Sequence, residues 1–249
     1  MNQSLDGFNA QAMIWAAGRG ERMRPLTDHT PKPLLRVRGQ PLLHWPLKAL
    51  AQAGVDRVVI NTAWLGEQIP QALGARIDWP NGVSQALRYS KEGEDFGRAL
   101  ETAGGILRAL PGLDEVFWVM AGDVFAPQFD CGAHTLAQFR ASGKQAHLWL
   151  VPNPEHHPAG DFGLSAEGLA LDLPSGHPDR RYTFSTVALY RRDFFMRADA
   201  PTPPGNPQGV RAALAPLLRA AMARGEVSAE VYSGAWTDVG TPERLMAVS

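Results

Sequence analysis

The stretch AMIWAAGRGERMRPLT (Ala12–Thr27) joins a short apolar run to a loop rich in glycine and arginine. The run at Ala12–Ala16 predicts a buried strand, and leucines then recur at helical spacing until Gly54 ends the helix. A second apolar run follows at Arg57–Asn61. Strand, loop, helix and strand in this order are typical of a βαβ unit and of a parallel sheet covered by helices.

The same alternation continues along the chain. Val116–Met120 (VFWVM) is apolar throughout, as expected of a central parallel strand buried on both faces. Further helices are predicted at Leu65–Leu73, Thr102–Leu110 and Leu214–Met222, and further strands at Gln85–Tyr89, Ala146–Val151 and Val227–Tyr232. Less regular strands of a small appended sheet are expected at Phe162–Leu173 and Tyr182–Tyr190, and a proline-rich surface loop at Asp199–Gln208. We therefore predict an α/β, Rossmann-like three-layer fold with a mainly parallel central sheet.

Composition limits the classes of protein that the chain can represent. With 249 residues, 45% of them hydrophobic, it can form one domain over 11–249, preceded by a flexible extension at 1–10. The net charge of −1 predicts neither nucleic-acid nor membrane partners. The single cysteine, Cys131, excludes an internal disulfide and a thiolate zinc cluster and suits the cytoplasm.

The loop after the first strand has the residue types of a phosphate site. Gly18 and Gly20 allow backbone N–H groups to approach a phosphate closely, and Arg22 can bind phosphate oxygens bidentately. Met23 stands where a dinucleotide-binding fingerprint needs glycine, and no G-x-x-x-x-G-K-[ST] motif occurs. Taken alone, the loop could equally be a tight turn with solvated arginines.

A lysine follows in the segment TPKPLL (Thr30–Leu35), between two prolines that are expected to hold its backbone extended. A single lysine is usually just solvated. Because Lys32 is fixed in this way ten residues after Arg22, it indicates a second cation directed at the same anion.

Two aspartates are candidates for binding a metal. Asp123 follows the buried strand at Val116–Met120, and ligands of open parallel sheets bind at the carboxyl ends of strands. Asp238 lies in WTDVG, again between a predicted strand and a helix. Either could be a helix cap or turn residue instead. Together they could supply the protein's share of a Mg²⁺ site completed by phosphate oxygens.

AAGRGERMRPLT and TPKPLL resemble the motifs of the sugar-1-phosphate nucleotidyltransferases, G-x-G-x-R-[LM]-x-P-L-T and P-K-P-[LM]. The resemblance implies that Arg22 and Lys32 are catalytic and contact the triphosphate. Family motifs [LN]-G-D and W-x-D-[VTI]-G match at Asp123 and Asp238 and imply that these hold the catalytic Mg²⁺. The resemblance further implies a nucleotide site of Ala17, Gly18, Gly20, Glu21, Arg22, Lys32, Thr102 and Gly104, and a sugar site of Ala121 and Asp161.

Some details depart from the family pattern or stay open. Ala121 replaces the usual asparagine or leucine, which leaves a side-chain contact to the sugar in doubt. Glu92 and Glu94 are both candidates to meet the base, because Asp95–Ala99 is an insertion before the turn Glu101–Gly105. The pair His156-His157 lacks further ligands at zinc spacing and is expected to be polar loop. Trp64 and Trp236 flank the matched motifs and are expected to line the pocket.

The resemblance implies UTP and a sugar 1-phosphate as substrates. Stretches at Ile60–Ile69, Pro152–Phe162 and Tyr182–Thr186 resemble a branch of this family that uses N-acetylmuramic acid 1-phosphate, which implies this sugar and a role in recycling peptidoglycan. Mannose 1-phosphate with GTP, or glucose 1-phosphate with a pyrimidine triphosphate, are alternatives. A nucleotide-sugar sensor without turnover is a further one, although Arg22, Lys32 and both aspartates are present. The sequence does not predict an oligomeric state.

Overall fold

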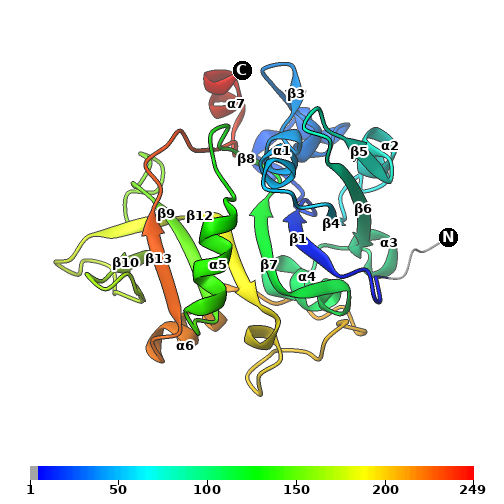
Figure 1. Cartoon of the computed structure of the whole chain (residues 1–249). Coiled ribbons are helices and arrows are strands. Elements are labelled where there is room, and N and C mark those ends of the chain that lie inside the picture. Colours follow the sequence, from blue (N-terminus) through cyan, green and yellow to red (C-terminus); the bar gives the residue numbers. More distant parts are fainter. Residues whose placement is uncertain (1–4) are drawn as a thin grey trace.

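A computed structural model of the chain describes residues 5–249, so residues 1–4 of the predicted extension lie outside it. Ten strands form the main sheet (Figure 1). They are β1 (Ala10–Trp15), β4 (Arg57–Thr62), β5 (Arg76–Asp78), β6 (Ser84–Lys91), β7 (Leu113–Ala121), β9 (Ala146–Val151), β10 (Phe162–Leu164), β11 (Ala170–Leu171), β12 (Arg181–Arg191) and β13 (Val227–Val231). The helices are α1 (His44–Gln52), α2 (Gln68–Leu73), α3 (Glu92–Phe96), α4 (Glu101–Ala109), α5 (Ala133–Ala141), α6 (Ala215–Ala223) and α7 (Pro242–Val248).

The centre of the sheet is parallel, as predicted. β1 pairs in parallel with both β4 and β7, and β6 extends the sheet beyond β4. Parallel strands need crossover connections, which place their carboxyl ends and the following loops at one edge. The glycine-arginine loop after β1 and the loop after β7 therefore lie side by side, and Gly122 N donates to Trp15 O at 2.8 Å.

Alternating side chains of the central strands bury both faces of the sheet. On β7, Phe117 and Val119 pack in one cluster with residues of α4 and α6, whereas Trp118 and Met120 pack in another with residues of α1 and α5. Continuous apolar runs such as VFWVM suit strands covered on both sides. The fold is thus the predicted three-layer α/β arrangement.

Two parts of the sequence-based prediction need correction. Tyr182–Tyr190 was expected in an appended sheet, but β12 lies in the main sheet, antiparallel between β7 and β9. Only β10 and β11 extend from its first residues. Helices α3 and α5 were not predicted; α5 buries one side chain, Phe139, so its apolar stripe is weak in the sequence.

The described part of the predicted extension packs onto the domain. Ala10 already lies in β1 with no exposed surface, and Leu5 and Phe8 pack against the core. The segment Asp199–Gln208 forms a loop, as expected, but it is not only a surface loop. Asn206 is fully buried, and its Nδ2 donates to Gly104 O at 3.1 Å.

Candidate active site

The loop after β1 folds back over Lys32. Gly20 has φ +66°, in the left-handed region that favours glycine, and its carbonyl accepts a hydrogen bond from Thr27 Oγ1 at 2.9 Å. A Cβ atom on Gly20 would lie only 3.2 Å from Lys32 Cβ. Glycine is therefore needed here for backbone conformation and for close approach, and the predicted loop and lysine are brought together.

Arg19 and Arg22 have different surroundings. The Arg19 guanidinium stacks on Trp64, 3.6 Å from the ring centroid, and donates to Asp28 at 3.2 Å. Its hydrogen bond lowers the pKa of Asp28. Arg22 is exposed, and its Nη2 would lie 3.2 Å from a Cβ on Gly240. Arg19 and Trp64 thus brace the loop, while Arg22 reaches the WTDVG segment.

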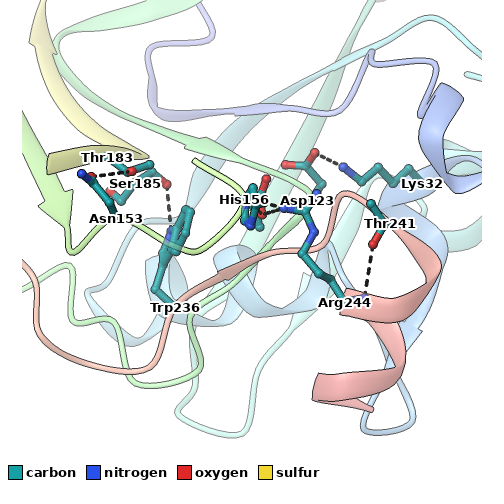
Figure 2. Close-up of polar contacts among 10 residues, drawn as sticks. Lys32, Asp123, Asn153, His156, Thr183, Ser185, Trp236, Thr241 and Arg244 are labelled. Carbon is teal, nitrogen blue, oxygen red and sulfur yellow. Dashed lines mark hydrogen bonds and ion pairs between the residues drawn. The ribbon is translucent and has the colours of Figure 1, made fainter. Parts of the chain in front are cut away.

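Lys32 lies beside Asp123, but not on extended backbone. It begins the 3₁₀ helix η3 (Lys32–Leu34), and only Pro31 before it is extended. The prediction of extended backbone at Lys32 was therefore wrong. The lysine side chain is 11% exposed, and its Nζ contacts Asp123 Oδ2 (Figure 2). A nearly buried ammonium is expected to face an anion, as it does here.

Asp123 and Asp238 converge although they lie 115 positions apart in the sequence. Short strands β8 (Val124–Phe125) and β14 (Thr237–Asp238) pair antiparallel, which places Asp238 opposite Val124. Val239 N donates to Asp123 O at 3.0 Å. Backbone pairing therefore brings the two aspartates to neighbouring positions at the carboxyl edge of the sheet, where the sequence predicts a metal site.

Arg244 and His156 also belong to this group, and neither was predicted. Arg244 Nη1 of α7 donates to Asp238 Oδ1 at 2.6 Å, and His156 Nε2 lies 3.1 Å from the same oxygen. Figure 2 shows both side chains converging from a loop and from α7. TPERL follows WTDVG directly, so the closeness of Arg244 to a predicted metal ligand in the sequence was the one available signal.

The donor set suits Mg²⁺ better than a softer metal. Asp123 and Asp238 offer hard carboxylate oxygens, and within residues 5–249 no group of three or more histidine, cysteine or acidic side chains could hold a metal. Mg²⁺ commonly takes one or two carboxylates and completes its shell with water and substrate phosphates.

Asp161 is held at the other side of the site. Its Oδ2 accepts from Phe184 N at 2.8 Å, and its Oδ1 lies 3.1 Å from His157 Nε2. Asp161 lines a cavity of about 230 Å³ that Trp15 and Thr102 also line. The structure thus brings together Asp161 and Thr102, which were predicted for the sugar and for the nucleotide.

Three other predicted residues are placed differently. Ala121 ends β7 opposite Trp15, with 8% of its surface exposed, so it offers little side chain to a ligand. Gly104 packs against the chain near α6, because a Cβ there would lie 2.6 Å from Val210 O. A contact between Gly104 and the nucleotide is therefore not supported. Trp236 Nε1 donates to Ser185 O at 3.1 Å and ties the WTDVG segment to β12.

The surroundings of Glu92 and Glu94 differ. Glu92 has no exposed surface; its Oε1 accepts from Asn61 Nδ2 at 2.8 Å and its Oε2 from Leu100 N at 2.7 Å. Asn61 Oδ1 in turn accepts from Ala16 N at 2.7 Å, at the start of the glycine-arginine loop. Glu94 is exposed and lines a cavity of about 340 Å³. Glu92 is therefore an internal brace, and of the two only Glu94 is open to a ligand.

Replacing Glu92 with alanine is expected to lower the free energy of unfolding by about 2–5 kcal/mol, because two buried donors lose their acceptor. Urea unfolding at pH 7 measures the change. Glu94→Ala is the matched control, since Glu94 is exposed, and it should change stability by less than about 0.5 kcal/mol. Equal effects of the two substitutions would contradict the assignment of Glu92 as a brace.

Glu92 also predicts a pH dependence. Burial raises its pKa above the ordinary 4.5, although the hydrogen bonds from Leu100 and Asn61 act to lower it. The folded chain therefore binds this proton more tightly than the unfolded chain. Stability from Glu92 is complete below about pH 4.5 and falls as pH rises through the raised value. Glu92→Gln does not titrate, so the stability of the wild type relative to this variant should fall with rising pH in that window.

Comparison with known proteins shows the family of the chain. Residues 11–170 match the nucleotidyl transferase family. The N-acetylmuramate alpha-1-phosphate uridylyltransferase of Neisseria meningitidis serogroup B is 45% identical over 94% of this chain and 95% of that protein. The Caulobacter vibrioides protein of the same name is 31% identical over 95% of this chain and 94% of that protein.

A solved structure supports the fold independently. A proposed glucose-1-phosphate thymidylyltransferase from Bacillus anthracis superposes with a TM-score of 0.76 at 21% identity, over 96% of this chain and 93% of that one. At this identity the likeness concerns the fold alone. The family match covers most of the chain, and both relatives align over nearly their whole length. The chain therefore belongs to the nucleotidyl transferase family and is a sugar-1-phosphate nucleotidyltransferase.

Proposed function

We propose that the chain transfers a uridylyl group from UTP to N-acetylmuramic acid 1-phosphate, giving UDP-N-acetylmuramic acid and pyrophosphate. The observation that carries the proposal is the convergence of Lys32, Asp123 and Asp238 at the edge of the sheet beside the glycine-arginine loop. The names of the relatives in Neisseria and Caulobacter support the choice of UTP and of this sugar.

In this reaction an oxygen of the sugar phosphate attacks the α-phosphorus of UTP, and the bond to pyrophosphate breaks. A phosphate monoester is largely dianionic near neutral pH, since its second pKa is about 6, so the attack needs no general base. Arg22 and Lys32 would bind the triphosphate and the leaving pyrophosphate. Such transfers depend mainly on alignment and on preorganised positive charge.

Asp123 and Asp238 would hold Mg²⁺ in the loaded enzyme. When bound, the ion would offset negative charge on the phosphates. Lys32 and Arg244 contact these carboxylates in the structure, so both cations already lie where phosphate oxygens would arrive. The backbone N–H groups of the loop at Ala17–Glu21, which includes Gly18 and Gly20, would meet the phosphate chain.

A further argument concerns Glu94, which we assign to the base side of the nucleotide site. It immediately precedes the insertion Asp95–Ala99, whose first two residues end α3. Arg108 pairs with Asp95 and stacks on Phe96. These contacts with α4 would hold the insertion, and with it the end of α3 that carries Glu94. No helix among residues 5–249 has the length and apolarity to cross a membrane.

A panel of substrate pairs tests the proposal. Pyrophosphate release is measured with UTP, GTP or dTTP against N-acetylmuramic acid 1-phosphate, N-acetylglucosamine 1-phosphate, glucose 1-phosphate and mannose 1-phosphate, each with Mg²⁺. Selective turnover of UTP with N-acetylmuramic acid 1-phosphate is expected. Preference for another pair would keep the chemistry and replace the substrate. Binding of UTP without turnover of any pair would favour a sensor.

A further inference from the structure

The cavity of about 230 Å³ beside Asp161, here called the α6 pocket, lies between the end of β1, the start of α4, strands β10 and β12, and helix α6. Its wall includes Trp15, Thr102, Phe184, Thr186 and Arg219. Aromatic and apolar surface with a few polar groups is typical of pockets that bind small molecules. Trp15 is opposite Ala121, two residues before Asp123, so the pocket adjoins the predicted metal site.

Arg219 is the single cationic side chain in the wall of the α6 pocket. It lies on the second turn of α6, and its Nε donates to Asp172 Oδ1 at 3.1 Å. Both side chains are about half exposed, at 49% and 44%. Within the described part of the chain, this is the one ion pair of Arg219, so its two Nη groups have no carboxylate of their own.

A cation at this place bears on the choice of sugar. N-acetylmuramic acid differs from N-acetylglucosamine by a lactyl ether that carries a carboxylate, so the two sugar phosphates differ by one negative charge remote from the reacting phosphate. A planar guanidinium is the side chain best suited to bind a carboxylate through two parallel hydrogen bonds. Asp161, on the same wall, is negative and would not meet that group.

A second observation concerns Trp15. Its indole N–H is buried and has no hydrogen-bond partner within residues 5–249. Buried donors of this kind ordinarily have an acceptor. Trp15 also lines the α6 pocket, and an oxygen-rich ligand such as a sugar carries acceptors that an apolar molecule does not.

We propose that Arg219 is a specificity-determining residue that binds the lactyl carboxylate of the sugar substrate in the α6 pocket, in exchange for its ion pair with Asp172. This inference rests on the proposed function, since only a sugar acid carries that group. The Arg219–Asp172 pair is exposed and therefore weak, so an incoming carboxylate can displace it at little cost. A neutral sugar would leave the pair intact.

The test is a cycle of two proteins and two ligands. Wild type and Arg219→Gln are each titrated by calorimetry with N-acetylmuramic acid 1-phosphate and with N-acetylglucosamine 1-phosphate, and kcat/KM is measured with UTP and Mg²⁺. Loss of a charge-assisted, bidentate contact should weaken binding of the acidic sugar about 10- to 100-fold, and the change should appear in KM rather than kcat. Binding of the neutral sugar should change less than about twofold.

Three further variants keep the test specific. Arg224→Gln at the exposed end of the same helix, where Arg224 pairs with Glu226, removes the same charge away from the pocket and should change neither ligand. Arg219→Lys keeps a charge without the fork and should restore part of the discrimination. Asp172→Asn removes the competing carboxylate and should tighten binding of the acidic sugar.

The outcomes separate this inference from the proposed function. If the wild type uses N-acetylmuramic acid 1-phosphate and Arg219→Gln weakens both sugars equally, Arg219 does not bind the lactyl group and the inference is wrong, while the proposed function stands. If the wild type uses neutral sugar phosphates and does not bind the acidic one, both fail. Urea midpoints of Arg219→Gln and Arg224→Gln should agree, because both residues lie on the surface.

Discussion

Asp123→Asn is expected to reduce turnover by at least about a thousandfold at saturating UTP and Mg²⁺, a loss of about 4 kcal/mol of transition-state stabilisation. Asparagine keeps the shape of the side chain but removes one of the two carboxylates that we propose as metal ligands. The measurement is pyrophosphate release over a range of Mg²⁺ concentrations, together with Mn²⁺ binding followed by electron paramagnetic resonance.

Metal binding gives this prediction a readout that does not depend on catalysis. Asp123→Asn should weaken Mn²⁺ binding in the presence of UTP. Asp238→Asn should do the same, because Asp238 pairs with Val124, the residue that follows Asp123, and so lies close to Asp123. Asp56→Asn is the control: Asp56 is exposed and precedes β4, at the opposite edge of the sheet. Unchanged Mn²⁺ affinity in both Asp123→Asn and Asp238→Asn would show that the metal lies elsewhere.

Arg22→Gln is expected to lower kcat/KM by about 10²- to 10³-fold, as for the removal of a preorganised charge at a developing anion. Arg22 is exposed and has no ion pair within residues 5–249, so the substitution should leave the urea midpoint unchanged. Arg24→Gln is a matched control in the same loop, because Arg24 is 58% exposed and pairs with Asp28. Steady-state kinetics and equilibrium UTP binding are measured for both variants.

The decisive comparison is between the losses of activity in Arg22→Gln and in Arg24→Gln. If Arg24→Gln lost as much activity as Arg22→Gln, general positive charge in the loop would matter rather than Arg22 itself. If Arg22→Gln were active but unstable, Arg22 would be structural, as Arg19 is through its stacking on Trp64 and its pair with Asp28.

Much of the fold could be predicted because buried parallel strands have a simple sequence pattern. The strands predicted at Val116–Met120 (VFWVM) and Ala146–Val151 are confirmed as parts of β7 and β9. Strands that are buried on both faces need continuous apolar residues, and this pattern is visible in the sequence. β12 was misplaced because Thr183 and Ser185 interrupt its pattern, and both are buried polar residues whose hydroxyls bond Asn153 and Trp149 O. Whether a buried hydroxyl finds a hydrogen-bond partner depends on tertiary contacts, and the periodicity of the sequence does not show these contacts.

The site could be predicted where each residue belongs to a local motif and not where it depends on pairing between distant segments. Asp123 follows β7, Asp238 lies in β14, and each matches a short motif, so each could be predicted separately. The two aspartates lie close together because β8 pairs with β14, and no local sequence pattern predicts this pairing. Arg244 and His156 join the site through that pairing, and were missed for the same reason.

The measurement that tests the central claim most directly is identification of the products formed by the wild type from UTP, N-acetylmuramic acid 1-phosphate and Mg²⁺. Mass spectrometry should find UDP-N-acetylmuramic acid and pyrophosphate in equal amounts, with no product when the metal is chelated. Binding of UTP and of the sugar phosphate without any nucleotide sugar would contradict the account.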